Sequence, residues 1–110
     1  MKAKIRAILK RPDESFGHMT NISPKLENLQ KIVGGGYVIK PIAEKPGLIV
    51  LCHYDLRGLP MKSLLDYYAD DCYCARTLIV CGMKGEDQEF IDIPIEFAEW
   101  KELVKEWRNL

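Results

Sequence analysis

The sequence predicts a single α+β domain in which helices pack on a mainly antiparallel sheet. The 110 residues are 47% hydrophobic and 29% charged, as in ordinary soluble globular domains. Apolar segments of strand length alternate with amphipathic helical patterns. Short loops join neighbouring strand segments, which favours antiparallel pairing. The expected order is β-α-β-β-α-β-β-α, and one compact domain is expected to span residues 1–110.

The first half of the chain predicts one strand, one helix and a strand hairpin. Residues 2–9, KAKIRAIL, alternate charged and apolar side chains as a half-buried strand does, and residues 10–21 are expected to form a polar connection. Ser23 suits the N-cap of a helix, with Pro24 at the first helical position. The apolar stripe of this helix is expected to consist of Leu26, Leu29, Ile32 and Val33. The segments YVIKPI and LIVLC then predict two strands joined by the loop AEKPG.

The second half predicts a short helix, two strands and a longer helix. MKSLLDYYA suits a short helix, while RTLIVC and EFIDI suit a buried strand and an alternating one. The segments GLIVLCHYDLRG and TLIVCGMKGED are similar enough that their strands could lie side by side. The last segment places its apolar side chains on one helical face: Phe97, Trp100, Leu103, Val104 and Trp107. Both tryptophans are expected in or beside the core, although in a loosely packed helix they would anchor a homodimer.

Three consecutive glycines, Gly34, Gly35 and Gly36, follow the first predicted helix and precede a strand. A phosphate-binding loop has the opposite order, because its glycines lead into a helix N-terminus whose N–H groups and positive dipole end face the anion. Here the carbonyl-rich end of the helix faces the glycines and would repel an anion. We therefore expect Gly34 to end the helix in a left-handed conformation, while the other two let the chain turn close to a neighbour.

The N-terminal end of the same helix is the better candidate for an anion-binding site. Thr20, Asn21 and Ser23 offer hydroxyl and amide groups, and Lys25 and His18 offer positive charge. Ordinary capping of the helix by Ser23 or Asn21 explains the same pattern.

The stretch CHYDLRG contains the densest group of candidate functional side chains. His53, Tyr54, Asp55 and Arg57 follow a buried strand, a position where binding groups often lie. His53 beside Asp55 could act as a general base, but no nucleophile or oxyanion motif accompanies them, so no catalytic residue is predicted. A polar turn in which Asp55 caps backbone groups explains the same residues.

The four cysteines predict neither disulfides nor a metal site. Lysines and arginines interrupt the N-terminal segment MKAKIRAILKRPDE, so no signal peptide is recognised, the thiols are expected to be reduced and the protein is expected to be cytoplasmic. Cys52 and Cys81 each end an apolar strand segment and are expected in the core. Cys72 and Cys74 form one C-x-C pair, a weaker signal than the C-x₂₋₄-C pairs of zinc sites. No cofactor is predicted.

The formal net charge is zero, but charge is divided unevenly along the chain. Residues 1–62 contain 11 Lys/Arg and 5 Asp/Glu, whereas residues 63–110 contain 5 and 11. Strands from the two halves would mix these charges if they interleave in one sheet. A neutral chain argues against direct nucleic-acid binding, because nucleic-acid-binding domains are usually strongly basic. The longest apolar runs are too short to cross a membrane.

At GHMTNISPKLENLQKIVGG and IVLCHYDLRGLP the sequence resembles a small uncharacterised family, domain of unknown function 3846. The resemblance spans roughly residues 5 to 100, and LQKIVGG and GLP are its most specific pieces. It implies a compact α+β domain encoded on phages, plasmids and conjugative elements, with no established activity or cofactor. Family members often have Asn where this chain has His53 and Lys62, Glu in place of Ile39, and no counterpart of Gly36. These changes favour a varying partner surface over a fixed reaction.

Together these features predict a non-enzymatic protein that contacts a host or mobile-element protein, for example to counter a host defence system. Tyr54 and Arg57 are the expected anchors, because interfaces favour Tyr and Arg. The complete predicted contact surface comprises Tyr37, His53, Tyr54, Asp55, Arg57 and Lys62. The alternative is a small-ligand protein that sequesters a nucleotide at the Ser23 end of the helix.

Overall fold

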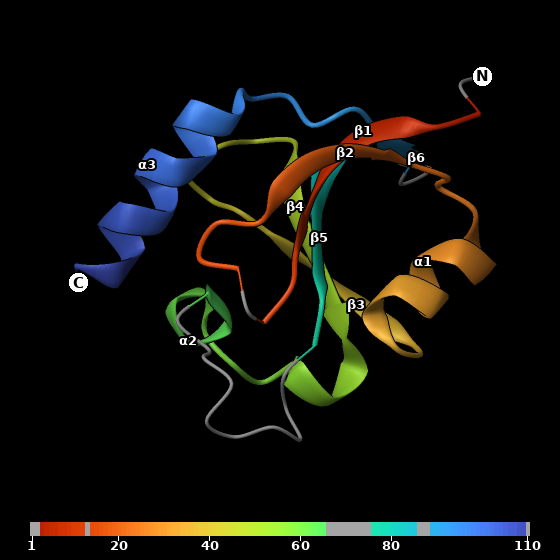
Figure 1. Ribbon diagram of the computed structural model, residues 1–110, viewed down its shortest axis with the longest axis horizontal. Coiled ribbons are helices and arrows are strands. Elements are labelled where there is room, and N and C mark those ends of the chain that lie inside the picture. The colour runs from red at the N-terminus through yellow and green to blue at the C-terminus, as the bar shows by residue number, and fades with distance from the viewer. Residues whose placement is uncertain (1–2, 13, 66–75, 86–88, 110) are drawn as a thin grey trace.

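A computed structural model of the protein describes residues 3–12, 14–65, 76–85 and 89–109 (Figure 1). The elements in chain order are β1 (Ile5–Lys10), β2 (His18–Ile22), α1 (Leu26–Val33), β3 (Tyr37–Pro41), β4 (Leu48–His53), the 3₁₀ turn η1 (Tyr54–Leu56), α2 (Met61–Leu65), β5 (Leu78–Lys84), β6 (Glu89–Ile91) and α3 (Phe97–Arg108). The strands form one antiparallel sheet in the order β2-β1-β5-β4-β3, with β6 also paired to β5. The predicted α+β class is confirmed.

The central strand of the sheet is β5. Its first half pairs with β1, where Val80 lies opposite Ile8, and its other edge pairs with β4. Gly82 lies opposite Leu48 on one side and opposite Ile91 on the other, so β6 continues along the edge that β1 leaves. The chain after β6 then returns to β1, because the N–H of Ile93 donates to the carbonyl of Arg6 at 2.8 Å.

Helices cover both faces of this sheet (Figure 1). Side chains of β4 and β5 alternate between the faces, because successive residues of a strand point to opposite sides. Val50 and Val80 pack with Trp100 of α3, whereas Leu51 and Ile79 pack in the layer beneath α1. Because β4 and β5 are buried on both faces, their sequences are continuously apolar instead of alternating.

The tryptophans of α3 are part of the core, as the sequence predicts. Trp100 has no exposed surface, Trp107 is 8% exposed, and their rings meet edge to face with centroids 5.9 Å apart. The indole N–H of Trp100 donates to the carbonyl of Phe16 at 2.9 Å, and Arg108 donates to the hydroxyl of Ser15 at 2.9 Å. These bonds hold the β1–β2 connection on α3, and the buried tryptophans offer no dimer surface.

The prediction of a polar connection over residues 10–21 is wrong in its second part, because residues 18–22 form β2. This strand is short, polar and at the edge of the sheet, and only Ile22 is buried, so its apolar signal is weak. Backbone pairing with β1, from Ile5 opposite Ile22 to Leu9 opposite His18, stabilises it instead. The order therefore contains one more strand than predicted.

The start of α1 also differs from the prediction. Lys25, not Ser23, occupies the N-cap position, and no side chain caps the helix there. The Ser23 hydroxyl instead accepts from the N–H of Lys25 at 3.4 Å, while the Asn28 amide donates to the carbonyl of Ser23 at 2.9 Å. These local bonds delay the helix by two residues. Leu26, predicted for the apolar stripe, is 55% exposed.

The end of α1 is as predicted. Gly34 adopts the left-handed conformation, with φ of 94°, and its N–H donates to the carbonyl of Gln30. Gly35 donates to the same carbonyl and also has positive φ, 148°. The glycines therefore end the helix and turn the chain into β3.

Three further expectations concern the mixing of the two charged halves, membrane-spanning helices and the C-x-C pair. β5, from the acidic half of the chain, lies between β1 and β4 from the basic half, so the two halves interleave in the sheet. Within the described part of the chain, no helix has the length and apolar character needed to span a membrane. The C-x-C pair, Cys72 and Cys74, whose weak metal-site signal the sequence shows, lies outside the described residues.

Gly82→Ala is expected to destabilise the protein. A Cβ at this position would lie 2.6 Å from the carbonyl oxygen of Asp92 and 2.9 Å from Cγ1 of Ile91, so the chain beside β5 would have to move. Overpacking of this kind costs about 1–3 kcal/mol in the free energy of unfolding. The matched control is Gly36→Ala, whose Cβ would meet nothing within 4 Å. Urea unfolding of both variants checks this, and equal stability would contradict the packing described.

Candidate functional site

The turn after β4 is a short, hydrogen-bonded structure built on the end of a buried strand. The N–H of Tyr54 donates to the carbonyl of Gly36 at 2.8 Å, which extends the β3–β4 pairing into the turn. The N–H of Arg57 donates to the carbonyl of Tyr54 at 3.1 Å and closes η1. Leu56, 6% exposed, anchors the turn in the core. The sheet therefore fixes the position of this turn.

Tyr54 and Arg57 form a stacked pair on the surface of the turn. Tyr54 is 51% exposed, and the guanidinium carbon of Arg57 lies 4.1 Å from the centroid of its ring. The same guanidinium donates to the carbonyl of Tyr54 at 3.2 Å. Cation–π attraction and this bond hold both side chains in one arrangement, so the pair presents an aromatic ring and a positive charge together.

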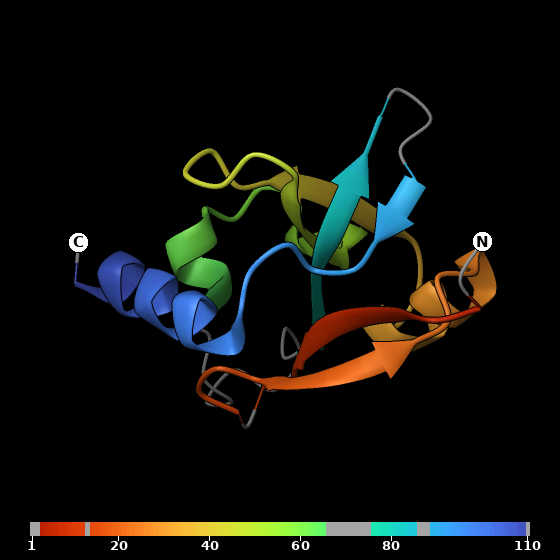
Figure 2. The same ribbon diagram turned by 90° about the horizontal axis from the view of Figure 1, so that it is seen from above.

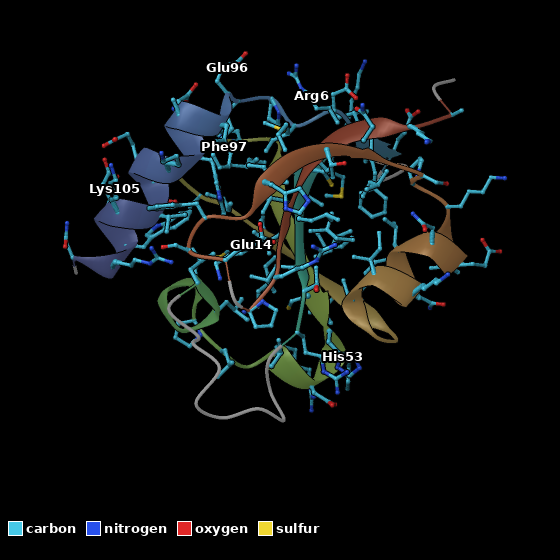
Figure 3. All side chains as sticks on the ribbon, in the orientation of Figure 1. Arg6, Glu14, His53, Glu96, Phe97 and Lys105 are labelled. Carbon is cyan, nitrogen blue, oxygen red and sulfur yellow. The ribbon has the colours of Figure 1, made fainter. Side chains whose placement is uncertain are left out.

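His53, labelled in Figure 3, lies at the end of β4 and caps the turn with its side chain. Its side chain is 13% exposed, and its Nδ1 accepts from the N–H of Asp55 at 3.0 Å. The expectation that Asp55 caps the backbone is therefore wrong, because the histidine does so. In the neutral ring, Nδ1 is then the acceptor and the proton is assigned to Nε2. Nε2 would lie 3.0 Å from a Cβ on Gly35, so this glycine makes room for the ring.

Arg76 joins the turn from the other side, just before β5. One of its guanidinium nitrogens lies 3.8 Å from Oδ2 of Asp55, and another would lie 2.8 Å from a Cβ on Gly34. The positive guanidinium thus lies at the negative end of the α1 dipole, which is a favourable position. Arg76 is not among the contact residues that the sequence predicts. The similar strand segments LIVLC and LIVC are the sequence signal that could have found Arg76. When they pair antiparallel, the end of β4 lies beside the start of β5, just after Arg76.

Two predicted contact residues remain: the Tyr37 ring packs elsewhere, and the Lys62 side chain is not among those described. Tyr37 lies opposite His53 in the β3–β4 pairing, but its half-buried ring packs edge to face against Phe90 at 6.3 Å. Burial raises the pKa of the Tyr37 hydroxyl, and Cys81 adds to this shift. Lys62 lies in α2, and its side chain is outside the part of the chain that the structure describes. The described surface therefore consists of His53, Tyr54, Asp55, Arg57 and Arg76.

The predicted anion-binding residues do not converge on one point. His18, at the far end of β2, bonds Oε2 of Glu14 through Nδ1 at 2.8 Å. The extended strand between His18 and Ser23 spans roughly 16 Å. Thr20 and Asn21 point to opposite faces of the sheet because they are adjacent in β2. Lys25 is exposed at the N-cap of α1, whose first turn also carries the acidic Glu27.

The cavity behind the turn is too small for a substrate. It holds about 10 Å³, which is room for about one water molecule. Its walls are formed by Lys10, Pro12, Leu56, Leu59, Leu64, Arg76 and Leu78. His53 does not line it, so this cavity gives the His53–Asp55 pair no place to act on a substrate.

Among the described residues, no group of three or more His, Cys, Asp or Glu side chains is arranged to hold a metal ion. Cys52 and Cys81 are buried free thiols, as predicted. Burial raises the pKa of both, and that of Cys81 reaches about 12. Lys40 opposes the shift at Cys52. Because the thiolate is the reactive form, both cysteines are expected to be inert.

No protein-family model, curated protein or solved structure matches this chain.

The thiol chemistry gives a direct test of the core. In the double variant Cys72→Ser/Cys74→Ser, Cys52 and Cys81 are the remaining thiols. At a pH near 8, about the ordinary thiol pKa, neither is expected to react with a disulfide reagent in the native protein, and both are expected to react after denaturation. Rapid native labelling of either thiol would contradict the burial of β4 and β5.

Proposed function

We propose that this chain is a non-enzymatic binding protein of a phage or mobile genetic element. It contacts a host or element protein in the cytoplasm, and countering a host defence system is the role proposed for this contact. The observation that carries the proposal is the stacked, exposed pair of Tyr54 and Arg57 on a turn fixed by the sheet. The sequence resemblance to a mobile-element family supports the proposed origin.

The chemistry of the pair suits a protein partner. Tyr and Arg are enriched among the residues that contribute most to protein interfaces. An aromatic side chain that is already held in place loses little conformational entropy on binding. Asp55, 67% exposed, and Arg76, 32% exposed, add both signs of charge beside the pair. A surface with an apolar ring and mixed charges favours a protein over the uniform negative charge of nucleic acid.

Removal of both anchors is expected to abolish partner capture without unfolding the protein. Tyr54→Ala/Arg57→Ala removes a pair of the kind whose members each contribute about 2 kcal/mol or more at an interface. Because both side chains are on the surface, the free energy of unfolding should change by less than about 1 kcal/mol. The measurement is affinity capture from host lysate followed by mass spectrometry, with the melting temperature recorded for each variant.

The matched control is Leu26→Ala. Leu26 is exposed to a similar extent, 55%, but lies at the start of α1. This variant is expected to capture the same protein as the unaltered chain. A folded Tyr54→Ala/Arg57→Ala variant that captures the partner undiminished would remove the assignment of this surface.

Thermal stability in the presence of nucleotides separates this function from nucleotide sequestration at the Ser23 end of α1. A nucleotide bound with a dissociation constant near 10 μM would stabilise the fold by about 2.7 kcal/mol at roughly 1 mM ligand. We expect no rise in melting temperature with mono-, di- or trinucleotides, because the residues predicted for that site do not converge. A rise that Lys25→Ala removes would favour sequestration instead.

A further inference from the structure

The outer edge of β2 has no partner strand in the described part of the chain. β2 and β3 are the two end strands of the sheet: β2 pairs with β1, and β3 pairs with β4. Figure 2 shows β2 as the outermost strand beside β1. Open edges expose unpaired backbone N–H and C=O groups, which can pair with another chain.

The two open edges differ in their protection. Proteins commonly protect an edge with charged side chains, especially Lys, and with Pro. β3, YVIKP, contains Lys40 and Pro41, whereas β2, HMTNI, contains no Lys, Arg, Asp, Glu or Pro. Asn21 is exposed, and Met19 and Thr20 are half-buried, so β2 presents an unprotected edge.

The pairing of β1 shows which backbone groups of β2 point outward. The N–H of Arg6 donates to Oδ1 of Asp92, and its carbonyl accepts from Ile93, so both groups of Arg6 point away from β2. Arg6 lies opposite Asn21, and this pair therefore makes no bonds across the β1–β2 ladder. Because bonding alternates along antiparallel strands, the N–H and C=O groups of Met19 and Asn21 point to the open edge.

We propose that two copies of this chain join through β2 as a symmetric antiparallel pair. Met19 of each copy lies opposite Asn21 of the other, and each pair exchanges N–H···O bonds. The two-fold axis passes between Thr20 of one copy and Thr20 of the other, which lie opposite each other. This register aligns all five residues of β2, with His18 opposite Ile22, and joins the two sheets into one.

A second copy fits this edge better than an unrelated strand for three reasons. The outward groups of Met19 and Asn21 are self-complementary about Thr20, and a Thr–Thr pair across strands is favourable. Antiparallel pairing brings the His18 end of β2, where Glu14 bonds the His18 ring, to the Ile22 end of the second copy, three residues before its exposed Lys25, so that an acidic and a basic side chain belong to the same end of the paired strands. The Trp100 bond to Phe16 already holds the β1–β2 connection in place, so pairing needs little further ordering.

Sedimentation equilibrium of the intact chain tests the dimer. The contact is at the small end of the range of protein interfaces, so the experiment covers about 1 μM to 1 mM chain. The expected result is a reversible monomer–dimer equilibrium within this range. A chain that is monomeric throughout, or that binds an added extended peptide but not itself, would overturn the proposal.

Charge changes at Thr20 test the proposed axis. Thr20→Lys and Thr20→Glu each place like charges opposite each other, and each variant alone should dimerise roughly fivefold more weakly. An equimolar mixture of the two should recover dimerisation as a heterodimer. Thr20→Val keeps the shape without a charge and should dimerise more tightly than either charged variant alone. A mixture no tighter than its components would overturn the two-fold register.

A backbone change tests the edge itself. Asn21→Pro removes an N–H that points outward and leaves the bonds to β1, so the variant should fold, as circular dichroism will show, and stay monomeric. A folded Asn21→Pro variant that dimerises undiminished would overturn the proposal. The dimer and the partner surface are independent, because Thr20→Lys should still capture the partner and Tyr54→Ala/Arg57→Ala should still dimerise.

Discussion

The pairing of β5 with strands on both of its edges is the constraint on which the rest of this structure depends. β1 and β6 share one edge of β5 and β4 occupies the other, so the strand is enclosed within the sheet. Its residues Ile79, Val80 and Cys81 have no exposed surface. Burial on both faces requires a helical layer on each side, and α1 and α3 supply these layers. Gly82 lets the chain after β6 come close enough to return to β1.

The candidate partner surface follows from the same constraint. β4 is held between β3 and β5, so the turn that follows it has a fixed position. The glycines after α1 then gain a second role, because they make room for His53 and Arg76 as well as ending the helix. The carbonyl of Gly36 also accepts from the N–H of Tyr54, while the Tyr54 ring is exposed and Arg57 stacks on it. The proposed binding function rests on the fixed position of the turn and on the exposure of this pair.

The sequence alone predicts the elements with strong apolar patterns. The apolar runs of β4 and β5, the amphipathic pattern of α3 and the glycine end of α1 are each visible in local residue order. β2 could not be predicted in this way, because HMTNI has little apolar signal and its stability comes from pairing with β1. The sequence predicts the start of α1 two residues too early, because Ser23 accepts a bond from the N–H of Lys25 just before the helix and does not cap it.

The candidate surface is predictable only in part. Tyr54, Asp55 and Arg57 are adjacent in the chain, so local sequence is enough to group them. The stacking of Arg57 on Tyr54 and the capping by His53 depend on backbone geometry that residue order does not specify. Arg76 approaches from a distant part of the chain, and its place depends on the pairing of β4 with β5. Tyr37 shows that strand pairing alone does not place a side chain in the site. It lies opposite His53 in the β3–β4 pairing, yet its ring packs against Phe90.

Amide hydrogen exchange measured residue by residue tests most directly whether the sheet fixes this turn. The N–H groups of Tyr54 and Arg57 are bonded to the carbonyls of Gly36 and Tyr54. If the turn is an extension of the β3–β4 pairing, the Tyr54 amide should exchange about as slowly as the bonded amides of β3 and β4, and the Arg57 amide should also be protected. Exchange at the rates of an unstructured peptide at both positions, beside a protected β4, would contradict the account.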